Sequence, residues 1–448
     1  MIGGGITGLA AAHELLTCTS DSDDVVVVYE GDDRVGGKLR TSQFAGLDVD
    51  EGADAFLTRV PHAVDLARVV GLSEELVAPT SARAAIWHRR LHEIPNDLML
   101  GVPTSMLAVA RSGLLSPIGL SRAALDVVLP KTSIRDDNLG RWVQRRFGRE
   151  VHDRLVDALV GSIYGADTIN FSLAAVPQLS TLATSGRSGL RTSRKLKANS
   201  TPTTAAIFGA PRTGMETFAQ AILSDVEHRY SVRFRLCTAT TVTSIDADGD
   251  QWRINDEQFD GVVIALPAHL AARLLGGSLG QQLDEFECAD VAIVTARIPQ
   301  DEWPDRCQSR SGYLVPKSVQ RAVTAVSFTS QKWAHLQPDD GSQVIRISLG
   351  RDGLPIGEFD NAGLVSLAAE DVSSHLGIAI DCSSSRVTRW KDAFTQYRPH
   401  HHVKVASIAA QLPPMIELAG SSYRGIGIPA CVADGQRAAR HLASAGSR

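Results

Sequence analysis

The sequence predicts an α/β and α+β protein in which a Rossmann-like nucleotide-binding domain is built from discontinuous segments. Three observations predict this fold class. A glycine-rich loop opens the chain and runs into a helix of small and apolar residues. A β-branched strand, Val25–Tyr29, follows that helix, as in the βαβ unit of a parallel sheet. The C-terminal tail then returns to a strand, a glycine-rich turn and a helix.

The opening loop has the spacing G-x-G-x-x-G at Gly3, Gly5 and Gly8, with Ile6 and Thr7 in the turn into the helix. Glycines at these positions permit a tight turn and a close approach of the backbone to a pyrophosphate. The phosphates then meet the free N–H groups at the N-terminus of the helix. All five residues are therefore predicted to contact a dinucleotide.

The strand before this loop is unusually short, because only Met1 and Ile2 precede Gly3. Strands usually run about 5–6 residues. We therefore expect the natural polypeptide to begin a few residues before Met1. We also expect this first strand to lie between Val25–Tyr29 and the strand of the C-terminal tail.

The stretch after the second strand favours a flavoprotein. Glu30 ends that strand, where an acid binds the ribose hydroxyls of a dinucleotide. The pattern E-x-x-x-R-x-G-G then follows, with Arg34 predicted to lie along the pyrophosphate and Gly36 and Gly37 to allow a close backbone approach. A second close-approach loop near the flavin is predicted at Gly52, Ala53 and Asp54.

Composition limits the class of protein. The 448 residues suit two or three domains, and a net charge of −5 gives no reason to expect nucleic acid. Six scattered cysteines form no C-x-x-C or metal-ligand spacing, so they are predicted to be reduced thiols of a cytoplasmic protein. No signal peptide and no membrane-spanning apolar run is expected.

The pattern of elements predicts three parts. Residues 1–79, 205–268 and 405–448 form the predicted FAD-binding domain, because strands and helices alternate there. Residues 80–97 and 269–404 are rich in strands and form a predicted mixed-sheet, substrate-binding domain. Residues 98–204 form a predicted helical subdomain, whose basic segment 185–204 is expected to be a mobile loop.

Residues 98–129 are apolar apart from Arg111 and Arg122. Two interpretations remain open. The segment is either a lip that touches a membrane or lines a channel for an apolar substrate, or part of a helical subdomain with its own core. We favour the second interpretation.

The tail is predicted to bring a helix N-terminus to the flavin ring. A strand, Met415–Leu418, leads to a turn at Gly420, Gly425 and Gly427 allow tight curvature, and Pro429 opens a helix. The partial positive charge of that helix end can face the side of the ring that becomes negative on reduction.

Seven segments together carry a family resemblance. They are GGGITGLAAA, YEGDDRVGGKLRT, LVGSIYGADTINFSL, SGYLVP, KWAHL, FTQYRPHH and LAGSSYRGIGIPACVADG. With them the chain resembles the oxygen-dependent porphyrinogen oxidases, from Gly3 to about Arg440. It is most similar to the Gram-positive and actinobacterial branch, whose members oxidise coproporphyrinogen III to coproporphyrin III. The fold is shared with flavin amine oxidases and phytoene desaturases, so the fold alone does not define the function.

The resemblance implies roles for individual residues. FAD would contact Gly3, Gly5, Gly8, Glu30, Arg34, Gly37, Lys38, Leu39, Val242, Gly427, Ile428 and Pro429, with Val242 binding the adenine edge by its backbone. The turn Tyr164, Gly165, Ala166 would face the flavin across the macrocycle. The family usually has alanine before glycine in this turn, whereas this chain has Gly165 before Ala166. An alanine carbonyl can face the substrate only if its φ is not positive.

The implied chemistry is three two-electron steps that each take a hydride from a meso carbon, with O₂ as the acceptor. Such a reaction depends on positioning more than on a strong base. Protoporphyrinogen IX, an amine or a carotenoid remain alternative substrates, and a non-catalytic relative without FAD is a further alternative. Heme-pathway enzymes that act downstream and a peripheral membrane surface are the further partners considered.

The indications for a metal site and for cations that bind the substrate are weaker than those for the cofactor site. The run PHHHV is not expected to bind a metal, because adjacent histidines on an extended strand point to opposite faces. By resemblance, His401 matches a histidine of the family. The propionates of the substrate call for cations at the mouth of the site, and the candidates are Arg59, Arg89, Arg90, Lys317 and the segment Arg187–Lys197, although each is more simply a solvated surface charge.

Overall fold

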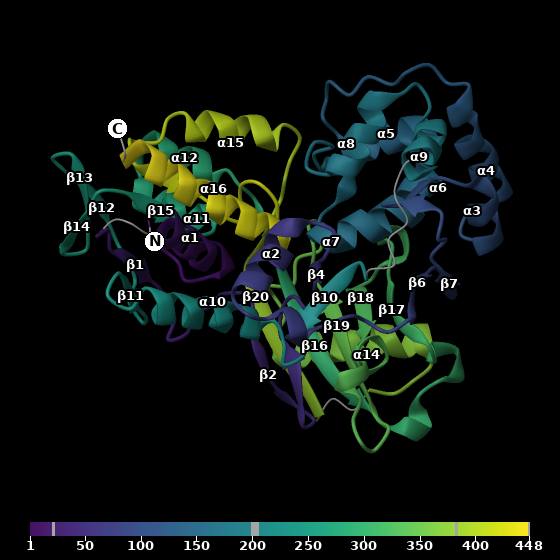
Figure 1. The fold of residues 1–448 in the computed structure, drawn as a ribbon. Helices are drawn as coiled ribbons and strands as arrows, with labels where there is room; N and C mark the ends of the chain where they lie inside the picture. Colours follow the sequence, from purple (N-terminus) through teal and green to yellow (C-terminus); the bar gives the residue numbers. More distant parts are fainter. Residues whose placement is uncertain (20–22, 199–205, 381–383, 447–448) are drawn as a thin grey trace.

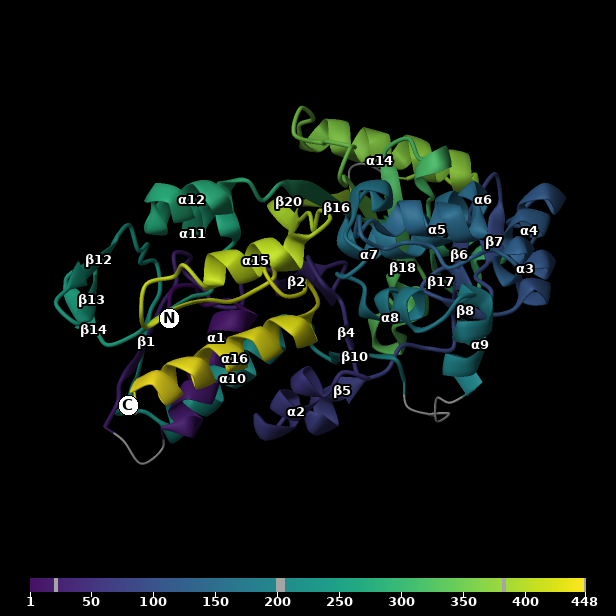
Figure 2. The same ribbon diagram turned by 90° about the horizontal axis from the view of Figure 1, so that it is seen from above.

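The computed structural model describes residues 1–19, 23–198, 206–380 and 384–446. Three bodies are visible (Figures 1 and 2). In Figure 1 a nucleotide-binding body lies on the left, a helical body at the upper right, and a body built on a large sheet at the lower right. The predicted fold class, with a mixed sheet and many helices, is confirmed. The domain bounds themselves stay a prediction.

The nucleotide-binding body is centred on a parallel sheet. Its strands are β1 (Val26–Tyr29), β11 (Phe234–Cys237), β15 (Val262–Ile264) and β21 (Ile416–Leu418). The helices packed around it are α1 (Ile6–Cys18), α2 (Pro61–Val69), α10 (Glu216–Arg229), α11 (Ala268–Leu275), α12 (Gly277–Asp284), α15 (His401–Ala409) and α16 (Ile428–Gly446). The smaller strands are β2 (Thr41–Phe44), β3 (Leu47–Asp50), β4 (Phe56–Leu57), β5 (Leu76–Val77), β10 (Phe208–Pro211), β12 (Ile245–Asp248), β13 (Gln251–Ile254) and β14 (Glu257–Phe259).

The first strand is reduced to a bridge, and its neighbour differs from the predicted one. Ile2 pairs with Tyr29 of β1 on one side and with Ile264 of β15 on the other. The tail strand β21 is one position further out, paired with β15. The prediction that the tail strand flanks the first strand is therefore wrong, because residues 262–264 take that place.

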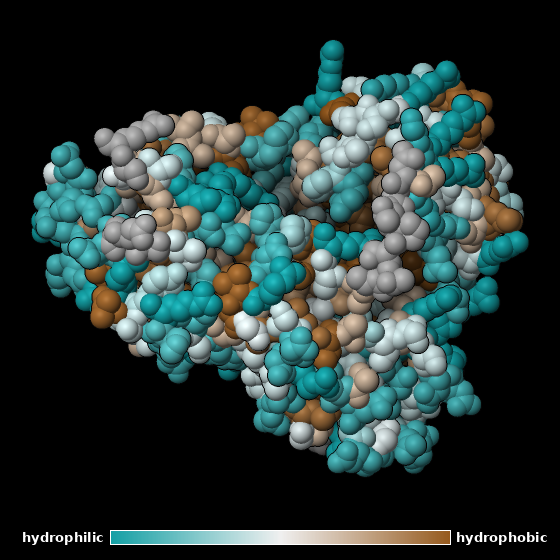
Figure 3. All heavy atoms as spheres, viewed as in Figure 1, coloured by the Kyte–Doolittle hydropathy of each residue, from teal (hydrophilic) through white to brown (hydrophobic). Residues whose placement is uncertain are grey.

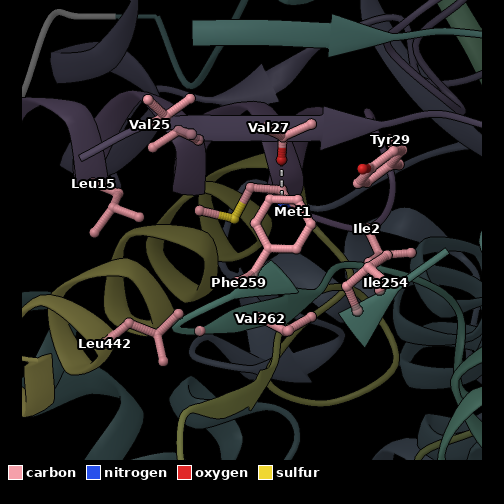
Figure 4. Close-up of a pocket in the computed structure, with 12 residues that line it drawn as sticks. Met1, Ile2, Leu15, Val25, Val27, Tyr29, Ile254, Phe259, Val262 and Leu442 are labelled. Carbon is pink, nitrogen blue, oxygen red and sulfur yellow. Dashed lines mark hydrogen bonds between the residues drawn. The ribbon is translucent and has the colours of Figure 1, made fainter. Parts of the chain in front are cut away.

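Backbone hydrogen bonds run from Met1 and Ile2 to both neighbours. The Met1 amino group donates to the Val27 carbonyl over 2.6 Å, and the Ile2 N–H donates to the Val263 carbonyl over 2.8 Å. Figure 4 shows the small cavity beside these residues. Its lining is Met1, Ile2, Leu15, Val25, Val26, Val27, Tyr29, Ile254, Phe259, Gly261, Val262 and Leu442. This side of the sheet is apolar.

The second body is a seven-stranded sheet in the order β20-β16-β19-β18-β17-β6-β7. The strands are β6 (Arg83–Trp87), β7 (Leu91–Glu93), β16 (Cys288–Ile298), β17 (Arg310–Leu314), β18 (Val323–Phe328), β19 (Gln343–Leu349) and β20 (Ser385–Thr395). Helix α14 (Asn361–Leu376) covers one face, where an apolar core forms, and short α13 (Thr329–Lys332) follows β18. Strands β6 and β7 pair as an antiparallel hairpin at the edge of the sheet.

The third body is helical and has its own core around Trp142, Phe147 and Phe171. Its helices are α3 (Met106–Ser112), α4 (Pro117–Ala124), α5 (Leu139–Phe147), α6 (Arg149–Val151), the π-helix η3 (His152–Gly161), α7 (Ser162–Tyr164), α8 (Pro177–Ser185) and α9 (Gly189–Ala198), with strands β8 (Leu98–Met99) and β9 (Val102–Pro103). The favoured interpretation of residues 98–129 agrees with this core.

Short 3₁₀ turns connect the longer elements. They are η1 (Ser73–Glu75), η2 (Leu125–Val127), η4 (Thr168–Asn170), η5 (Gln300–Glu302), η6 (Asp305–Cys307), η7 (Lys317–Val319) and η8 (Ala334–Leu336).

Two local predictions are wrong. The basic segment begins as helix α9 rather than as a mobile loop, because Leu190 and Ser193 are buried on one face of it; residues 199–205 lie outside the described residues. The run PHHHV leads into helix α15 rather than forming a strand. His401 and His402 are the first residues of this helix, and the helical turn points His401 into the interior and leaves His402 exposed.

Apolar side chains remain on the surface of the helical body. Leu107, Ile118, Leu125 and Val128 are at least half exposed. Figure 3 shows brown side chains among polar ones at its right edge, over α3 and α4. Among the described residues, no helix combines the length and apolar character that crossing a membrane requires.

Candidate active site

A cavity of about 580 Å³ lies where the three bodies meet. Its lining draws on all three. From the nucleotide-binding body come Gly3, Gly5, Ile6, Thr7, Glu30, Gly36, Gly37, Lys38, Leu39, Gly52, Ala53, Asp54, Ala265, Leu266, Pro267, Leu270, Gly420, Ser421, Ile426, Ile428 and Cys431. The sheet body adds Val291, Ile293, Thr324, Ser327, Lys332, Arg346, Ser348, Gly350, Arg351, Trp390, Ala393 and Phe394, and the helical body adds Gly161, Ser162 and Gly165.

The glycine loop forms one end of this cavity. Gly3 has a φ of +103°, which favours glycine, and a side chain at Gly8 would begin 1.9 Å from the Gly3 carbonyl oxygen. Helix α1 starts at Ile6 with the extended Gly5 as its N-cap and no capping side chain. Its first N–H groups therefore remain free for a ligand phosphate.

Glu30 is fixed by the backbone. Its Oε2 accepts the Gly4 N–H over 2.7 Å and its Oε1 accepts the Asp32 N–H over 2.9 Å. Each carboxylate oxygen has a second lone pair, so Glu30 can still accept hydroxyl groups of a ribose. It lines the cavity directly after β1, and its role at a ribose stays a prediction.

Arg34 does not line the described cavity. Its guanidinium donates to the carbonyls of Val35, Leu39 and Gly37 over 2.8–3.1 Å. In this structure it therefore holds the turn that carries Gly36 and Gly37, which have φ values of +104° and +56°. The role along a pyrophosphate stays a prediction.

Four other predicted cofactor residues lie outside the lining. Gly8 is inside α1, and Gly427 and Pro429 flank Ile428, which does line the cavity at the start of α16. Val242 is buried against Ile2 and Tyr29 in an apolar cluster.

A loop from the nucleotide-binding body closes over the sheet. A side chain at Gly52 would begin 2.3 Å from the Lys38 carbonyl oxygen, so the two backbones are in close contact. Burial raises the pKa of the Asp54 carboxyl, but Lys332 at 2.7 Å and Arg346 at 3.4 Å outweigh it and lower that pKa to about 2. Asp54 is therefore a charged, paired group at neutral pH.

Lys38 lies deep in the same region. Its ammonium donates to the Ala393 carbonyl, and burial lowers its pKa. This contact ties the glycine-rich turn to strand β20 of the sheet body.

The sheet shows two different faces. Toward α14 it presents Val294, Ile345 and Ile347, which are fully buried. Toward the cavity it presents the alternate residues Ile293, Arg346, Ser348 and Ser327. Alternation along each strand thus separates an apolar core from a partly polar binding wall.

The turn predicted to face the substrate also reaches the cavity. Gly165 lines the cavity with a φ of +56°, whereas Tyr164 and Ala166 do not line it. The Gly165 carbonyl accepts the Asp352 N–H over 2.8 Å, and the Ala166 carbonyl accepts from Arg351. The positive φ therefore falls on the glycine, so the exchanged order of glycine and alanine causes no backbone strain.

A buried ion pair holds this turn. Arg351 contacts both oxygens of Asp157 at 2.7 and 3.0 Å, and both side chains are 2% exposed. Asp157 lies on η3, a ten-residue π-helix that ends at Gly161, and such helices are rare. Burial raises the pKa of Asp157, but Arg351 and Thr168 outweigh it, so that pKa lies below its ordinary value.

His401 and the predicted surface cations do not line the cavity. His401 stacks on Tyr397 with ring centroids 4.0 Å apart, and burial lowers its pKa to about 4. Lys317 pairs with Asp167 at 2.6 Å. The cations that do line the cavity are Lys332, Arg346 and Arg351, in addition to Lys38. Sequence reasoning missed these three, although Arg346 lies within the alternating segment QVIRISLG and Arg351 directly follows it.

Within the described part of the chain no group of three or more histidine, cysteine or acidic side chains could hold a metal ion. The five described cysteines are free thiols, and Cys382 lies outside the described residues.

The fold and the site define a class of protein. A parallel sheet with a glycine loop at a helix N-terminus, facing a cavity shared with a second sheet, is the architecture of a dinucleotide-dependent oxidoreductase. Residues 6–443 match the family described as flavin containing amine oxidoreductase. The chain belongs to this family. The family description confirms the predicted flavin cofactor as a flavin, without naming which one.

Curated relatives match over nearly the whole chain. A coproporphyrinogen III oxidase of Mycobacterium leprae is 32% identical over 99% of this chain and 97% of its own length. One from Bacillus subtilis is 28% identical over 98% of this chain and 96% of its own. The predicted resemblance to porphyrinogen oxidases is thereby confirmed.

Solved structures share the fold. A structure from Exiguobacterium sp. 255-15, described as a candidate protoporphyrinogen oxidase, has a TM-score of 0.87 at 24% identity and covers 100% of this chain and 98% of its own. Cyclohexylamine oxidase from Brevibacterium oxydans has a TM-score of 0.65 at 18% identity, covering 100% and 98%.

Proposed function

We propose that this protein is an FAD-dependent oxidase that converts coproporphyrinogen III to coproporphyrin III with O₂ as the electron acceptor. The observation that carries this proposal is the full-length match to relatives named coproporphyrinogen III oxidase in mycobacteria and in Bacillus. A three-walled cavity with cations on its sheet wall agrees with a large substrate that carries carboxylates.

The residues present fit FAD. Gly5 lines the cavity, and no atom lies within 4 Å of the place where its side chain would begin, so the backbone there leaves open space for a ligand; Glu30 retains free lone pairs at the ribose position. Gly3, Gly5, Ile6 and Thr7 would bind the pyrophosphate, and Gly420 and Ile428 would lie against the ring. When bound, FAD supplies the two-electron acceptor for each oxidation step.

The protein's own contribution is positioning. The turn at Gly165, which the Asp352 N–H and Arg351 fix through the Gly165 and Ala166 carbonyls, would position the substrate in the cavity. Tyr164 and Ala166 would act through the conformation of this turn. Aromatisation drives the reaction, so no strong general base is required, and the described lining offers no histidine for that role.

The test is turnover by purified holoprotein. We expect a flavin absorption band, porphyrin fluorescence when coproporphyrinogen III is added in air, and O₂ consumption with release of peroxide. Omitting NAD(P) should change nothing. Faster turnover of protoporphyrinogen IX or of an amine, or a requirement for NAD(P), would contradict the proposal.

A further inference from the structure

Residues 394–398, at the end of strand β20 and just beyond it, lie between two loops that reach the cavity. One is the loop at residues 420–426, which leads into α16, and the other is the turn at residues 164–166. Both loops supply residues to the cavity lining, among them Gly420 and Gly165. Among the described residues, no hydrogen bond joins the two loops directly. We call residues 394–398, which bond to both, the connecting segment.

The odd-numbered side chains of the connecting segment contact the loop that leads into α16. The Tyr397 hydroxyl donates to the Ser421 carbonyl over 2.7 Å and accepts the Gly425 N–H over 2.8 Å. The Thr395 hydroxyl lies 2.9 Å from the Ser422 hydroxyl. Both Thr395 and Tyr397 are buried. Their hydroxyl groups therefore fix the conformation of this loop from inside the protein.

The even-numbered side chains contact the turn at Gly165. The Gln396 Nε2 donates to the Gly165 carbonyl over 3.3 Å. Arg398 contacts the Asp352 carboxylate at 2.5 and 3.1 Å, and the Asp352 N–H donates to the same Gly165 carbonyl over 2.8 Å. The ring of Phe394 packs so close that a side chain at Gly165 would begin 3.1 Å from it. All three side chains therefore act on one turn.

This division follows from strand geometry. Successive side chains of an extended strand point to opposite sides. The contacts of the connecting segment follow this alternation past Thr395, the last residue of β20. The segment thus spans the gap between the two loops and presents a separate set of side chains to each.

The connecting segment is itself anchored. The Gln396 N–H donates to the Glu287 carbonyl over 2.8 Å, next to strand β16, and the Tyr397 carbonyl accepts the Ser172 N–H of the helical body over 2.7 Å. The Tyr397 ring also stacks on His401, with ring centroids 4.0 Å apart. A segment held in this way can fix the positions of the loops that it contacts.

We propose that Tyr397 and Gln396 are positioning residues that set the separation of the two loops across the cavity. This inference rests on the proposed function, because it assigns the flavin ring to the loop at Gly420 and the substrate to the turn at Gly165. Hydride transfer requires reacting atoms about 3–3.5 Å apart, and a misplacement of about 1 Å can cost about 100-fold in rate. Tyr397 acts on the flavin side, and Gln396 acts on the substrate side.

The flavin side is tested with Tyr397→Phe, which keeps the stacked ring and removes the hydroxyl that bonds Ser421 and Gly425. Two lost hydrogen bonds should raise the Kd for FAD about tenfold, measured by the fluorescence of FAD released when the holoprotein is diluted. Tyr313→Phe is the matched control. Its hydroxyl lies 3.1 Å from the Nδ1 of His375, and Tyr313 does not line the cavity, so its Kd for FAD should equal that of the wild type.

A second variant on the flavin side is Thr395→Val, which removes only the contact with Ser422. It should raise the Kd for FAD about threefold, because a single neutral hydrogen bond is lost. Melting temperature and circular dichroism check the folding of each variant. Thr395→Val therefore still tests the flavin side if Tyr397→Phe does not fold.

The substrate side is tested with Gln396→Met, which keeps the side-chain volume and removes the donor to Gly165. We expect the anaerobic reduction of the bound flavin by coproporphyrinogen III to slow about tenfold, because the turn loses its position. Reoxidation by O₂, the Kd for FAD and the Kd for coproporphyrin III should equal those of the wild type. A purely structural role of Gln396 would not separate the two half-reactions.

Gln144→Met is the matched control for this variant. The Gln144 amide lies 3.3 Å from the Nδ1 of His152, and Gln144 does not line the cavity. Both half-reactions should proceed in Gln144→Met as in the wild type.

Three results would overturn the proposal. They are a wild-type Kd for FAD in Tyr397→Phe and Thr395→Val, a wild-type rate of flavin reduction in Gln396→Met, and an equal loss of FAD affinity in Tyr397→Phe and Gln396→Met. The proposed function fails separately, if coproporphyrinogen III does not reduce the flavin of the wild-type holoprotein. The FAD affinities still test the flavin side in that case.

Discussion

At the nucleotide end of the cavity, Gly3 and Gly36 shape the wall through their backbone and Gly8 packs directly behind Gly3, whereas at the sheet end Arg346, Arg351 and Asp157 act through their side chains. The first end comes from two short stretches, residues 3–8 and 30–39. The second brings together Asp157 and Arg351, which are 194 residues apart in sequence. We infer that the first end tolerates no added atom at Gly3, Gly8 or Gly36, where a side chain would meet backbone oxygen, and that the second end does not tolerate the loss of an ion-pair partner.

The largest effect is expected at the sheet end, from Arg351→Met. It leaves the Asp157 carboxylate buried without its partner, which typically costs about 3–5 kcal/mol of unfolding free energy. Denaturant unfolding of the purified protein measures this. Arg68→Met is the control, because Arg68 and its partner Asp65 are 64% and 57% exposed, and its effect should stay below about 0.5 kcal/mol. Equal losses in both variants would remove the distinction between the two ends.

At the nucleotide end, Gly8→Ala should be the most harmful small change. The added carbon would begin 1.9 Å from the Gly3 carbonyl oxygen, so the loop or the helix must move, at a cost of about 1–3 kcal/mol. Flavin should also be lost during gel filtration. Gly5→Ala is the stability control. No atom lies within 4 Å of the position that its new side-chain carbon would take, and the φ of Gly5, −71°, is one that alanine adopts without strain. A stable, flavin-retaining Gly8→Ala variant would contradict the close-approach argument.

A side chain that does matter at the nucleotide end is Glu30. Glu30→Ala removes two acceptors at the ribose position, and each bond to a charged group contributes about 1.5–3 kcal/mol. We expect weaker flavin retention with the fold intact, measured by flavin absorbance per protein after gel filtration and by circular dichroism. Glu30→Gln should be intermediate. Full occupancy in Glu30→Ala would refute the ribose assignment.

The smallest stability effect is expected for Gly165→Ala. Its φ of +56° costs an alanine about 1–2 kcal/mol, and the new carbon would lie 3.1 Å from Phe394. Gly249→Ala is the matched control. Gly249 has a φ of +64°, no atom lies within 4 Å of the place where a side chain would begin, and the residue does not line the cavity. Both variants should lose similar melting temperature, but only Gly165→Ala should lower kcat with coproporphyrinogen III. Equal activities would show that Gly165 has no part in positioning.

Much of the nucleotide end follows from the sequence. Spacing alone predicts the loop at Gly3–Gly8, the acid at Glu30 and the turn at Gly36, because these features depend on local backbone geometry. The same local reasoning is wrong for His401, which opens a helix, and for the basic segment, which folds as α9. In both cases packing against distant residues decides the conformation.

The sequence by itself determined the fold class, the flavin family and the short-range turns, because glycine spacing and strand periodicity act within about 40 residues. Only the tertiary structure decided which strand flanks Ile2, how Arg34 is used, and which cations face the cavity. Arg346 and Arg351 become part of the wall because β19 lies between β16 and β18 and because η3 brings Asp157 to its end. Strand order and long-range pairing have no local signature, so charges of this kind cannot be told from surface charges until the chain is folded.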